Sequence, residues 1–521
     1  MNEVYAEFSV EMDLPSALLD PDGIAILDPD GIEIEVNSGW VDVMADARAQ
    51  VPISYKSGNP GNAIDDRVAD EGVITLAMDN SENNSAGVLG YYSTDNAAVR
   101  SGFEQGVMAR IKAVYDGVTY YQQQGKISTI LPTSGVAGER ITMVEALDYM
   151  HELYDADFVD VNVQVNKRDD ELLTTLIASA ARPPEAVDFD LGNDQYTYAF
   201  HDEISGTSKI VTVIQKMMMS GLGKVFVRGG TTSAEMLTYF NRGNLLSPGS
   251  AVAALDDNMT SLEVSRDETS LVKKVNVTTY PVEIDQSDVE LWQLNAEVAL
   301  DPGTSKSFTM FLRDPNGRAT KVAALSLVTP VADTDFKFSS TSGSGNDLNA
   351  DLGIEYSDGT NSIEVTVTNN SGSAGYLWFF KPRGKGIYLY EPVTTRKLTG
   401  QKSGKTLDIK MIYQEDSGVG RDIVAIVSSW FETPQTNIKA VHFIANTSDE
   451  LMTAALVVEK GDYVTVKETL TGVDRGFIVN GIDKEIRAGN ILYVTWYTCN
   501  VEILDAFILD VDALDEGVLG V

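Results

Sequence analysis

Short runs of alternating apolar and polar residues, each bounded by Gly, Asn, Asp or Ser, recur along most of this chain and constrain its fold strongly. Clear cases are GIEIEV, GVITLAMD, KKVNVTTYPVEI, NSIEVTVTNN, DYVTVKETL and ILYVTWYT. A period of two places one face of an extended strand against a core, and the flanking residue types favour turns. The sequence therefore predicts a mainly β protein.

Helical periodicity is concentrated in one region, with one further case nearer the end of the chain. Apolar residues three or four apart predict helices over 141–157, 169–181, 208–224 and 420–432. The residues expected on the buried faces are Val144, Leu147, Met150 and Tyr154; Leu172, Leu173, Leu176 and Ile177; Ile210, Val213, Ile214, Met217 and Met218; and Ile423, Val427 and Trp430. The clustering of the first three helices predicts an α/β middle domain.

The chain is too long for one hydrophobic core, and its 521 residues predict about three or four domains. We interpret 1–133 as a β-barrel-like domain, 134–270 as an α/β domain, 271–396 as a β-sandwich and 397–521 as a final β domain with one helix. The Gly, Ser and Asn-rich segment 339–353 is expected to be a long loop on the sandwich, because strand patterns resume on both sides of it.

The hexapeptide LDPDGI occurs twice, eight residues apart, within residues 19–32. Each copy places Pro and then Asp-Gly where a tight turn needs them. The ligand spacing of a helical calcium loop is absent, and no third copy suggests a repeat array. We predict two tight turns. The alternative is that Asp22 and Asp30 are incidental cation ligands.

Net charge is the most prominent feature of the composition, with 77 acidic residues against 39 Lys and Arg, or −38. A field of this sign repels phosphate and argues against nucleic-acid binding by counterion release. Two readings stay open. The charge serves solubility, or it lines a conduit through which DNA slides without sticking.

The single cysteine, Cys499, excludes an intramolecular disulfide and a multi-cysteine metal site, and its apolar surroundings predict a buried hydrophobic residue. The first residues lack a basic and apolar secretion signal, and no stretch is long and apolar enough to span a membrane. We therefore expect a soluble chain made in a cytoplasm, unless it is assembled into a larger object.

No residue set indicates catalysis, and we expect no enzyme activity, no cofactor and no metal. The three histidines, His151, His201 and His442, lie in unrelated contexts, and His201 in YAFHDEISG is expected to be a solvated loop residue. There is no nucleophile elbow, phosphate loop or dinucleotide fingerprint. Paired carboxylates are frequent by chance in so acidic a chain, so nothing singles out a glycosidase pair.

An ordered series of patterns from residue 40 to 132 is more specific. It comprises a W-x-D-[VI]-x-x-D strand, an I-S-x-x-x-G-N turn, a D-R-V-A-x-x-G segment leading to D-N-S-E, an L-G-Y-Y-S loop and a closing G-x-I-x-x-I-x-P strand. In this order it resembles the amino-terminal half of hub or minor tail proteins of long-tailed bacteriophages. The residues that carry the resemblance are Trp40, Asp42, Asp46, Ile53, Ser54, Asp66, Arg67, Ala69, Gly72, Asp79, Asn80, Leu89, Gly90, Tyr91, Tyr92 and Gly125.

A second block is similar to the carboxyl end of the same proteins. It consists of GDYVTV from Gly461, FIVNGI from Phe477 to Ile482, IRAGNILYVTWYT around Trp496, and a terminal AFILDVDALDEGVLG. KKVNVTTYPVEI and YLWFFKPRGKGIYLYEP, which lie between the blocks, are similar to other parts of this family. The region 285–370 has no such likeness, and its role is open.

The resemblance implies a non-enzymatic virion protein, a homotrimer in which each chain supplies two tube-like β-barrel domains to a pseudo-sixfold ring. The two domains would be the amino-terminal barrel and the block after Leu398, with the α/β domain and the β-sandwich insertion outside or beneath. Implied partners are further copies of the chain, a distal tail or tail tube protein, the tape measure protein and tail fibre or tip proteins. The ring would lie at the tail tip, be assembled in the host cytoplasm and let DNA pass without specific binding.

Two other functions are considered. In a receptor- or carbohydrate-binding tail tip protein, the loop 339–353 and Trp292 or Trp378 would contact the cell, although tryptophans are more often core residues. A tail-associated wall hydrolase is the third possibility, and the absence of an appended catalytic module before Val521 weighs against it.

Overall fold

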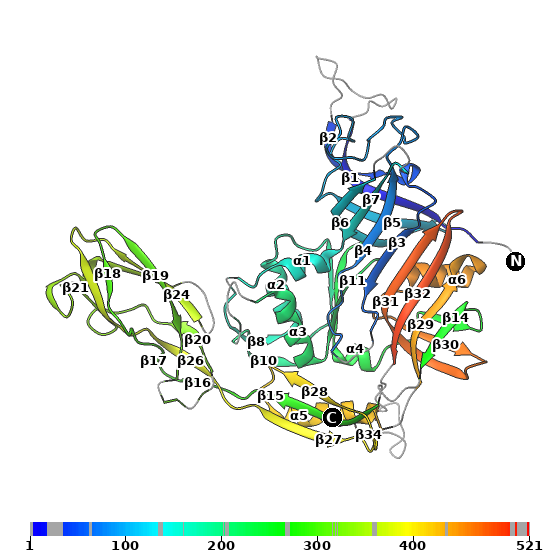
Figure 1. Cartoon of the computed structure of the whole chain (residues 1–521). Coiled ribbons are helices and arrows are strands. Elements are labelled where there is room, and N and C mark those ends of the chain that lie inside the picture. Colours follow the sequence, from blue (N-terminus) through cyan, green and yellow to red (C-terminus); the bar gives the residue numbers. More distant parts are fainter. Residues whose placement is uncertain are drawn as a thin grey trace.

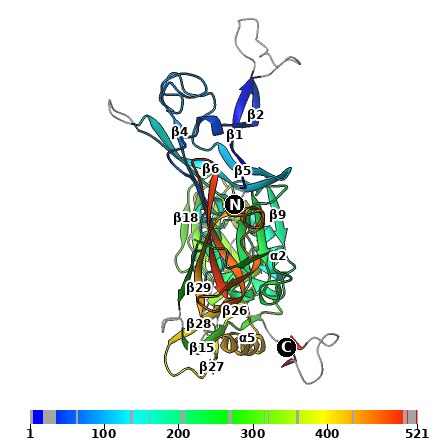
Figure 2. The ribbon, with the colours of Figure 1, turned by 90° about the vertical axis from the view of Figure 1, so that its right-hand side faces the viewer.

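The structure is a computed structural model that describes residues 4–17, 35–61, 65–133, 139–159, 161–201, 203, 208–265, 271–314, 316–317, 319, 321–356, 362–432, 436–500, 506–507 and 518–519. The predicted turns at 19–32 lie outside these residues. Figure 1 shows a molecule that is broad in one view, and Figure 2 shows that it is narrow in the perpendicular view.

A 13-stranded sheet is the largest element and is built from both ends of the chain. Its main path runs, in order, through β14 (Ser261–Ser265), β29 (Asn437–Ile444), β32 (Ile491–Asn500), β31 (Val473–Arg487), β3 (Ile53–Gly58), β4 (Val73–Asp79), β7 (Ile141–Leu147), β6 (Val118–Pro132), β5 (Met108–Tyr115), β1 (Glu7–Ala17) and β2 (Glu35–Asp42). Off this path, β30 (Tyr463–Glu468) pairs with β31 and with β13 (Ala253–Asp256). The prediction of a mainly β protein is confirmed.

The two ends of the chain meet where β3 pairs with β31, from Ile53 opposite Ile486 to Gly58 opposite Gly481. We call β1 to β7 the N-terminal half-sheet, and β13, β14 and β29 to β32 the C-terminal half-sheet. Each half contains one strand of 15 residues, β6 or β31. Each long strand carries a bulge and changes partner along its length, β6 from β5 to β7 and β31 from β30 to β3. The halves therefore share one feature, a long bulged strand that changes partner along its length.

One hydrophobic core serves both half-sheets. Phe8, Leu76 and Ile111 from the first half and Phe443 and Trp496 from the second are buried in the same cluster. The helix α6 (Asp449–Val457) belongs to this core and was not predicted. Its N-cap Ser448 accepts a hydrogen bond from the backbone N–H of Leu451, and acidic residues occupy its first turn.

The α/β unit lies beside the sheet (Figure 1). Its elements are α1 (Tyr149–Asp155), β8 (Gln164–Arg168), α2 (Asp169–Ala178), β9 (Ala186–Phe189), β10 (Gln195–Ala199), α3 (Ile210–Gly221), β11 (Lys224–Arg228), β12 (Met236–Phe240) and α4 (Arg242–Leu246). β9 and β12 are parallel, which confirms the α/β character of the middle region. The predicted apolar face of α3 is buried throughout, from Ile210 to Met218.

The helix predicted over 141–157 is partly wrong. Residues Ile141–Leu147 form the strand β7, and the helix α1 begins only at Tyr149. The β-branched residues in ITMVEAL favour a strand, and they bury alternate side chains such as Val144 on the core of the sheet. Asp148 then accepts a hydrogen bond from the backbone N–H of Met150 and starts the helix.

A third unit packs the helix α5 (Ser417–Trp430) on a sheet of β27 (Val393–Leu398), β15 (Val272–Thr279) and β28 (Lys405–Met411). The predicted helix near 420–432 is confirmed, and it buries Ile423 and Val427 while Trp430 is half-buried. The sequence predicted that this helix would belong to the final β domain. It lies instead in the third unit, and the helix that packs with the C-terminal half-sheet is α6.

The β-sandwich is inserted between β15 and β27 and projects from the rest of the molecule (Figure 1). Its strands are β16 (Val282–Ile284), β17 (Val289–Glu290), β18 (Val298–Leu300), β19 (Ser305–Phe311), β20 (Lys321–Leu327), β21 (Phe336–Thr341), β22 (Ser344–Asp347), β23 (Leu352–Tyr356), β24 (Ser362–Asn369), β25 (Gly375–Phe380) and β26 (Arg383–Leu389). It has a core of its own around Phe338 and Val365. The segment 339–353 is less of a loop than predicted, because β22 pairs with β21 within it.

The sheets do not coincide with the four sequence ranges that were expected as domains. β7 joins the N-terminal half-sheet although it lies beyond residue 133, and β13 and β14 pair with β30 and β29 although they lie before residue 270. Pairing between distant segments determines which sheet a strand joins. The periodicity of a single segment carries no information about that pairing.

Candidate functional site

One face of the sheet packs on the shared core where the two half-sheets join, and the opposite face carries polar side chains. Along β31, Ile482, Lys484 and Ile486 are buried, whereas Asp483 and Glu485 are half-buried and Arg487 is exposed on the other face. This alternation follows from the period of two in a strand. The join between β3 and β31 therefore presents a polar surface on its outer side.

Neighbouring strands continue this surface in register. Lys56 lies opposite Asp483, and Ser54 lies opposite Glu485. Residues directly opposite one another in antiparallel strands point to the same side of the sheet. We call the surface formed by these side chains the seam face; it comprises Ser54, Lys56, Glu263, His442, Asp483, Glu485, Arg487, Tyr493, Thr495 and Tyr497.

Cations on the seam face are paired with carboxylates. Lys56 Nζ lies 3.1 Å from Asp483 Oδ2, and Arg487 Nη2 lies 2.7 Å from Glu485 Oε2. The hydrogen bond to Asp483 raises the pKa of Lys56, and burial raises the pKa of Asp483. The seam face is thus close to charge balance, unlike the chain as a whole.

A buried polar network lies beneath the seam face and joins the half-sheets. Lys484 Nζ donates to Gln122 Oε1 at 2.7 Å, and the hydroxyl of Tyr55 donates to the same oxygen at 2.9 Å. Gln122 Nε2 in turn donates to the carbonyl oxygen of Leu456 in α6, at 3.2 Å. Burial lowers the pKa of Lys484 to about 8. One amide side chain therefore connects β6, β31, β3 and α6.

A second polar network stabilises the long segment between β4 and β5. This segment contains Asn80, Leu89, Gly90, Tyr91 and Tyr92 of the family pattern. Asp46 is buried, and its carboxylate accepts from the backbone N–H of Ser85 at 2.6 Å, the Ser85 hydroxyl at 2.7 Å and the Tyr92 hydroxyl at 2.6 Å. Asn80 Oδ1 accepts from the backbone N–H of Tyr92 at 2.8 Å. These pattern residues have a structural role, because they satisfy buried backbone groups of the segment.

The three histidines do not converge. His151 in α1 contacts Glu71 at 2.9 Å, and His442 contacts Thr495 and Glu263 on the seam face. His201 is only 1% exposed, so the expectation of a solvated loop residue is wrong; its ring packs edge-on against Tyr413. Among the described residues, no group of His, Cys, Asp and Glu is arranged to hold a metal ion.

The remaining sequence candidates are half-buried. Cys499 lies in β32 with intermediate exposure, which is less burial than expected. Trp292 stacks on Phe308 with ring centroids 5.9 Å apart, and Trp378 Nε1 donates to Ser339 Oγ at 3.1 Å. Among the described helices, none is long and apolar enough to cross a membrane.

No protein-family model and no curated protein matches this sequence. A tail protein from Neisseria meningitidis aligns with 94% of this chain and 96% of its own length, at 9% identity and a TM-score of 0.45. The 43 kDa tail protein of prophage MuSo2 from Shewanella oneidensis aligns with 95% of this chain and 99% of its own length, at 9% identity and a TM-score of 0.46. Both are described as tail proteins, the second one from a prophage.

An E. coli component of the type VI secretion system, described as structurally similar to the T4 tail proteins gp27 and gp5, aligns with 88% of this chain and 76% of its own length, at 8% identity and a TM-score of 0.35. The three structures align with most of this chain at TM-scores below 0.5.

Proposed function

We propose that this chain is a non-enzymatic structural hub of a bacteriophage tail tip, and that three copies form a pseudo-sixfold ring that caps the tail tube. The observation that carries the proposal is the construction of the large sheet. Two half-sheets, each with a bulged strand of 15 residues, are joined edge to edge within one chain at β3 and β31. One chain so built supplies two ring units, and three chains supply six.

The open edges of the sheet support assembly by strand pairing. Within the part of the chain that the structure describes, the main path ends at β2 on one side and at β14 on the other. An edge strand presents backbone N–H and C=O groups that can pair with another chain. In the proposed ring, an edge of one copy meets an edge of the next, and the closed ring leaves no free edge.

The seam face supports passage of DNA without specific binding. Its two ammonium or guanidinium groups, on Lys56 and Arg487, are already paired with Asp483 and Glu485. A phosphate would have to displace these carboxylates, in a chain that carries a charge of −38. A charge-balanced lining within an acidic protein would let DNA slide.

The proposed partners follow from the family resemblance of the sequence. They are further copies of this chain, a distal tail or tail tube protein on one side, the tape measure protein inside, and tail fibre or tip proteins on the other side. The sandwich projects away from the large sheet, where it would lie outside the ring.

The first test is the mass and symmetry of the purified protein, by light scattering followed by negative-stain class averages. Three chains of 56.5 kDa give a particle of about 170 kDa, and the proposal expects a ring with a central hole. A monomer at every concentration, with no ring in the presence of a tail tube protein and with specific glycan binding, would contradict it. That result would favour the receptor- or carbohydrate-binding alternative.

A further inference from the structure

The buried amine of Lys484 contacts the side-chain amide of Gln122, and the proposed hub function makes no use of the chemistry that this contact allows. The two residues are 0% and 2% exposed, and Lys484 Nζ lies 2.7 Å from Gln122 Oε1. Because a C=O bond is about 1.2 Å long, the amine nitrogen lies within about 4 Å of the amide carbon Cδ. A nucleophilic nitrogen is therefore held next to an amide carbon in the interior of the protein.

A bulge in β6 sets the direction of the Gln122 side chain. The residues on either side of Gln122 pair with consecutive residues of β5, so Gln122 is the additional residue of the bulge. Such a residue leaves the regular alternation of a strand, and its side chain is turned in a new direction. Gln122 Nε2 donates to the carbonyl oxygen of Leu456 in α6 at 3.2 Å, which holds the other end of the amide. The amide is thus fixed with its oxygen toward Lys484.

The hydroxyl of Tyr55 lies at the same amide oxygen. Tyr55 is 2% exposed and donates to Gln122 Oε1 at 2.9 Å. Burial raises the pKa of Tyr55, so the hydroxyl keeps its proton and remains a donor. When an amine adds to an amide carbon, negative charge develops on the amide oxygen, and a fixed donor in a buried site stabilises that charge. Tyr55 therefore occupies the position of an oxyanion donor.

The environment of Lys484 favours the reactive form of its amine. Burial lowers the pKa of Lys484 to about 8, and only the uncharged amine has a lone pair to donate. The other charged groups that act on Lys484 are Glu459 and Lys460, and these two are paired with each other, with Lys460 Nζ 2.7 Å from Glu459 Oε2. Near pH 8 a large share of the Lys484 amine is therefore uncharged.

We propose that Lys484 and Gln122 form an intramolecular isopeptide bond, with Tyr55 as the donor to the amide oxygen. The lone pair of Nζ forms a bond to Cδ, and the bond between Cδ and Nε2 breaks. One proton passes from Nζ to Nε2, which leaves as ammonia, and the carbonyl group at Cδ is restored. The reaction needs no oxidant, reductant or co-reactant. The newly folded chain holds the contact as a hydrogen bond, and the covalent form accumulates with time.

The bond would join β31 to β6 and hence the two half-sheets to each other. It links residues 362 positions apart, so it restricts the unfolded chain over a long loop. The proposal does not depend on the proposed hub function, because it follows from the contact within one chain.

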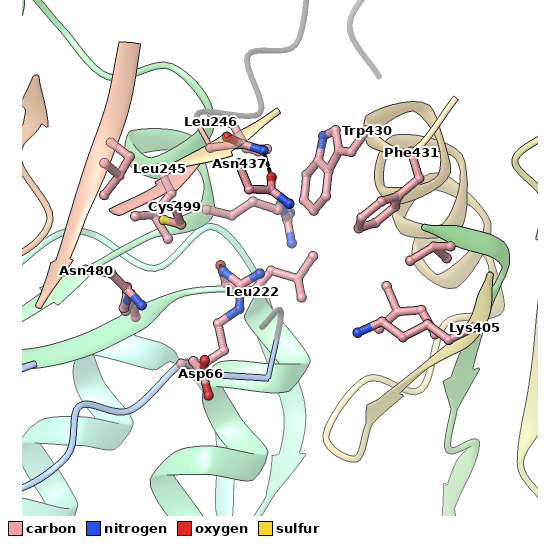
Figure 3. A pocket seen from close by; sticks show the side chains of 17 residues that line it. Asp66, Leu222, Leu245, Leu246, Lys405, Trp430, Phe431, Asn437, Asn480 and Cys499 are labelled. Carbon is pink, nitrogen blue, oxygen red and sulfur yellow. Dashed lines mark hydrogen bonds between the residues drawn. The ribbon is translucent and has the colours of Figure 1, made fainter. Parts of the chain in front are cut away.

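Lys224 is a second buried lysine and provides an internal comparison. It is 6% exposed, and burial lowers its pKa to about 8 as well. It lines a cavity of about 200 Å³ where the large sheet, the α/β unit and the third unit meet. Figure 3 shows this cavity, with Asn437 and Asn480 among the residues that line it.

The side-chain amides of this cavity are bound to other groups. Asn500 Nδ2 donates to Asn437 Oδ1 at 2.6 Å, and Asn480 Nδ2 donates to the carbonyl oxygen of Gly61. Burial and a lowered pKa are thus common to both lysines, whereas the contact with a fixed and polarised amide is described for Lys484. We therefore expect Lys224 to stay unmodified.

The test is the mass of the purified full chain, measured at purification and during incubation at pH 8.5. The mass should be lower than that of the sequence by one ammonia molecule, at the start or increasingly with time. Trypsin cuts after unmodified lysine, so it should leave Lys484 uncut while it cuts after Lys224. Fragmentation of the branched peptide should then join Lys484 to Gln122.

Three variants separate the reaction from folding. Gln122→Glu keeps the shape of the side chain but has no ammonia to lose, so its mass should stay unchanged. Tyr55→Phe should slow formation of the bond about a hundredfold. Tyr196→Phe is the matched control, because it removes a buried hydroxyl that donates to Asp169 in the α/β unit, and it should leave the rate unchanged.

A wild-type chain that is folded by circular dichroism and keeps the full mass throughout the incubation would overturn the proposal. Loss of ammonia located only at Asn316 or Asn480, each of which precedes a glycine, with Lys484 still cut by trypsin, would do the same. Equal rates for the wild type and Tyr55→Phe would refute the role given to Tyr55.

Discussion

Lys484 donates a hydrogen bond to Gln122 across 362 positions of the chain, and this contact lies inside the join between the two half-sheets. Both residues are buried, with 0% and 2% of their surfaces exposed. Neither half-sheet alone contains both partners, so the contact exists only when the two ends of the chain have come together. The join is therefore specified by a polar pair as well as by the apolar core.

Removing the acceptor should weaken this join. Gln122→Ala leaves the Lys484 ammonium without the amide oxygen that it donates to, and we expect a loss of about 2–4 kcal/mol in the free energy of unfolding. Gln124→Ala, on the same strand, is the control, because Gln124 Oε1 has no hydrogen-bond partner among the described residues. Urea unfolding at pH 7 measures both, and equal losses would show that the contact does not matter.

The lowered pKa of Lys484 gives this join a pH dependence. Its pKa is about 8 in the folded chain against 10.5 for the ordinary side chain, so between these values the unfolded chain binds more protons. Stability then rises with pH across this window, by about 1.4 kcal/mol per pH unit at most for one group. Lys484→Met removes the rise, and its deficit relative to the wild type should grow from pH 8 to 9.5. Parallel stability profiles over that range would refute the assignment.

Asp169 should act in the opposite direction. Its buried carboxylate accepts from the hydroxyls of Tyr196 and Tyr239, each at 3.0 Å, and burial raises its pKa to about 7. The folded chain therefore binds more protons than the unfolded chain between about pH 4 and 7, and stability falls as pH rises through that range. Asp169→Asn should gain stability relative to the wild type from pH 5 to pH 7.5, by up to about 3 kcal/mol.

The neighbouring Asp170 is the control for this pH effect. Although burial raises the pKa of Asp170, its hydrogen bonds from Arg168 and from the backbone N–H of Gly192 bring that pKa below its ordinary value. Asp170 thus contributes stability above the pKa of the unfolded carboxyl, and the contribution is lost as pH falls. Asp170→Asn should lose more stability at pH 7 than at pH 3, the reverse of Asp169→Asn. Thermal unfolding across pH compares the two.

Asp46 should control the order of the segment between β4 and β5. Asp46→Ala removes the acceptor of three hydrogen bonds from Ser85 and Tyr92 and should destabilise the chain by about 3 kcal/mol. Asp42→Ala is the control, because Asp42 is exposed and, among the described residues, accepts only from the backbone N–H of Met44. Hydrogen exchange should rise over residues 80–107 in Asp46→Ala alone. Unchanged protection there would show that the segment is held by other contacts.

Gly461 tests the contact between the sheet and the α/β unit. Its φ is +87°, and a Cβ at this position would lie 2.5 Å from Phe240 and 2.6 Å from Phe226. Gly472 has a φ of +70° but open space around it. Gly472→Ala should cost about 1 kcal/mol from backbone strain, and Gly461→Ala about 1–3 kcal/mol more from the clash. Similar unfolding midpoints for the two variants would show that Gly461 is not closely packed against the α/β unit.

Local periodicity predicted the elements whose burial depends on one face of one segment. In α3 the spacing from Ile210 to Met218 was sufficient, because a single helix face meets a single core. Local periodicity failed where the apolar residues of one segment fit both a helix and a strand. In ITMVEALDYM, the residues before Asp148 form the strand β7. The helix α6 had a signal in Ser448 followed by two acidic residues, which a search for N-caps would have found.

The join of the half-sheets and the cavity could not be predicted from the sequence in the same way. Gln122 and Lys484 lie in unremarkable polar positions of two strands, and only the pairing of β3 with β31 brings them together. Lys224 precedes a plain apolar run, VFV, and its burial depends on three units that come from distant parts of the chain.

The sandwich is connected to the rest of the chain at a single place, which would allow this module to be exchanged as a unit. Thr279 at the end of β15 lies directly opposite Val393 at the start of β27. The whole insertion therefore departs and returns through one pair of neighbouring residues, and a two-residue turn could close the same gap as a hairpin. An exchange of this one module would leave the large sheet and its join untouched. Recombination at this point offers a simple route by which the same large sheet could carry different appendages.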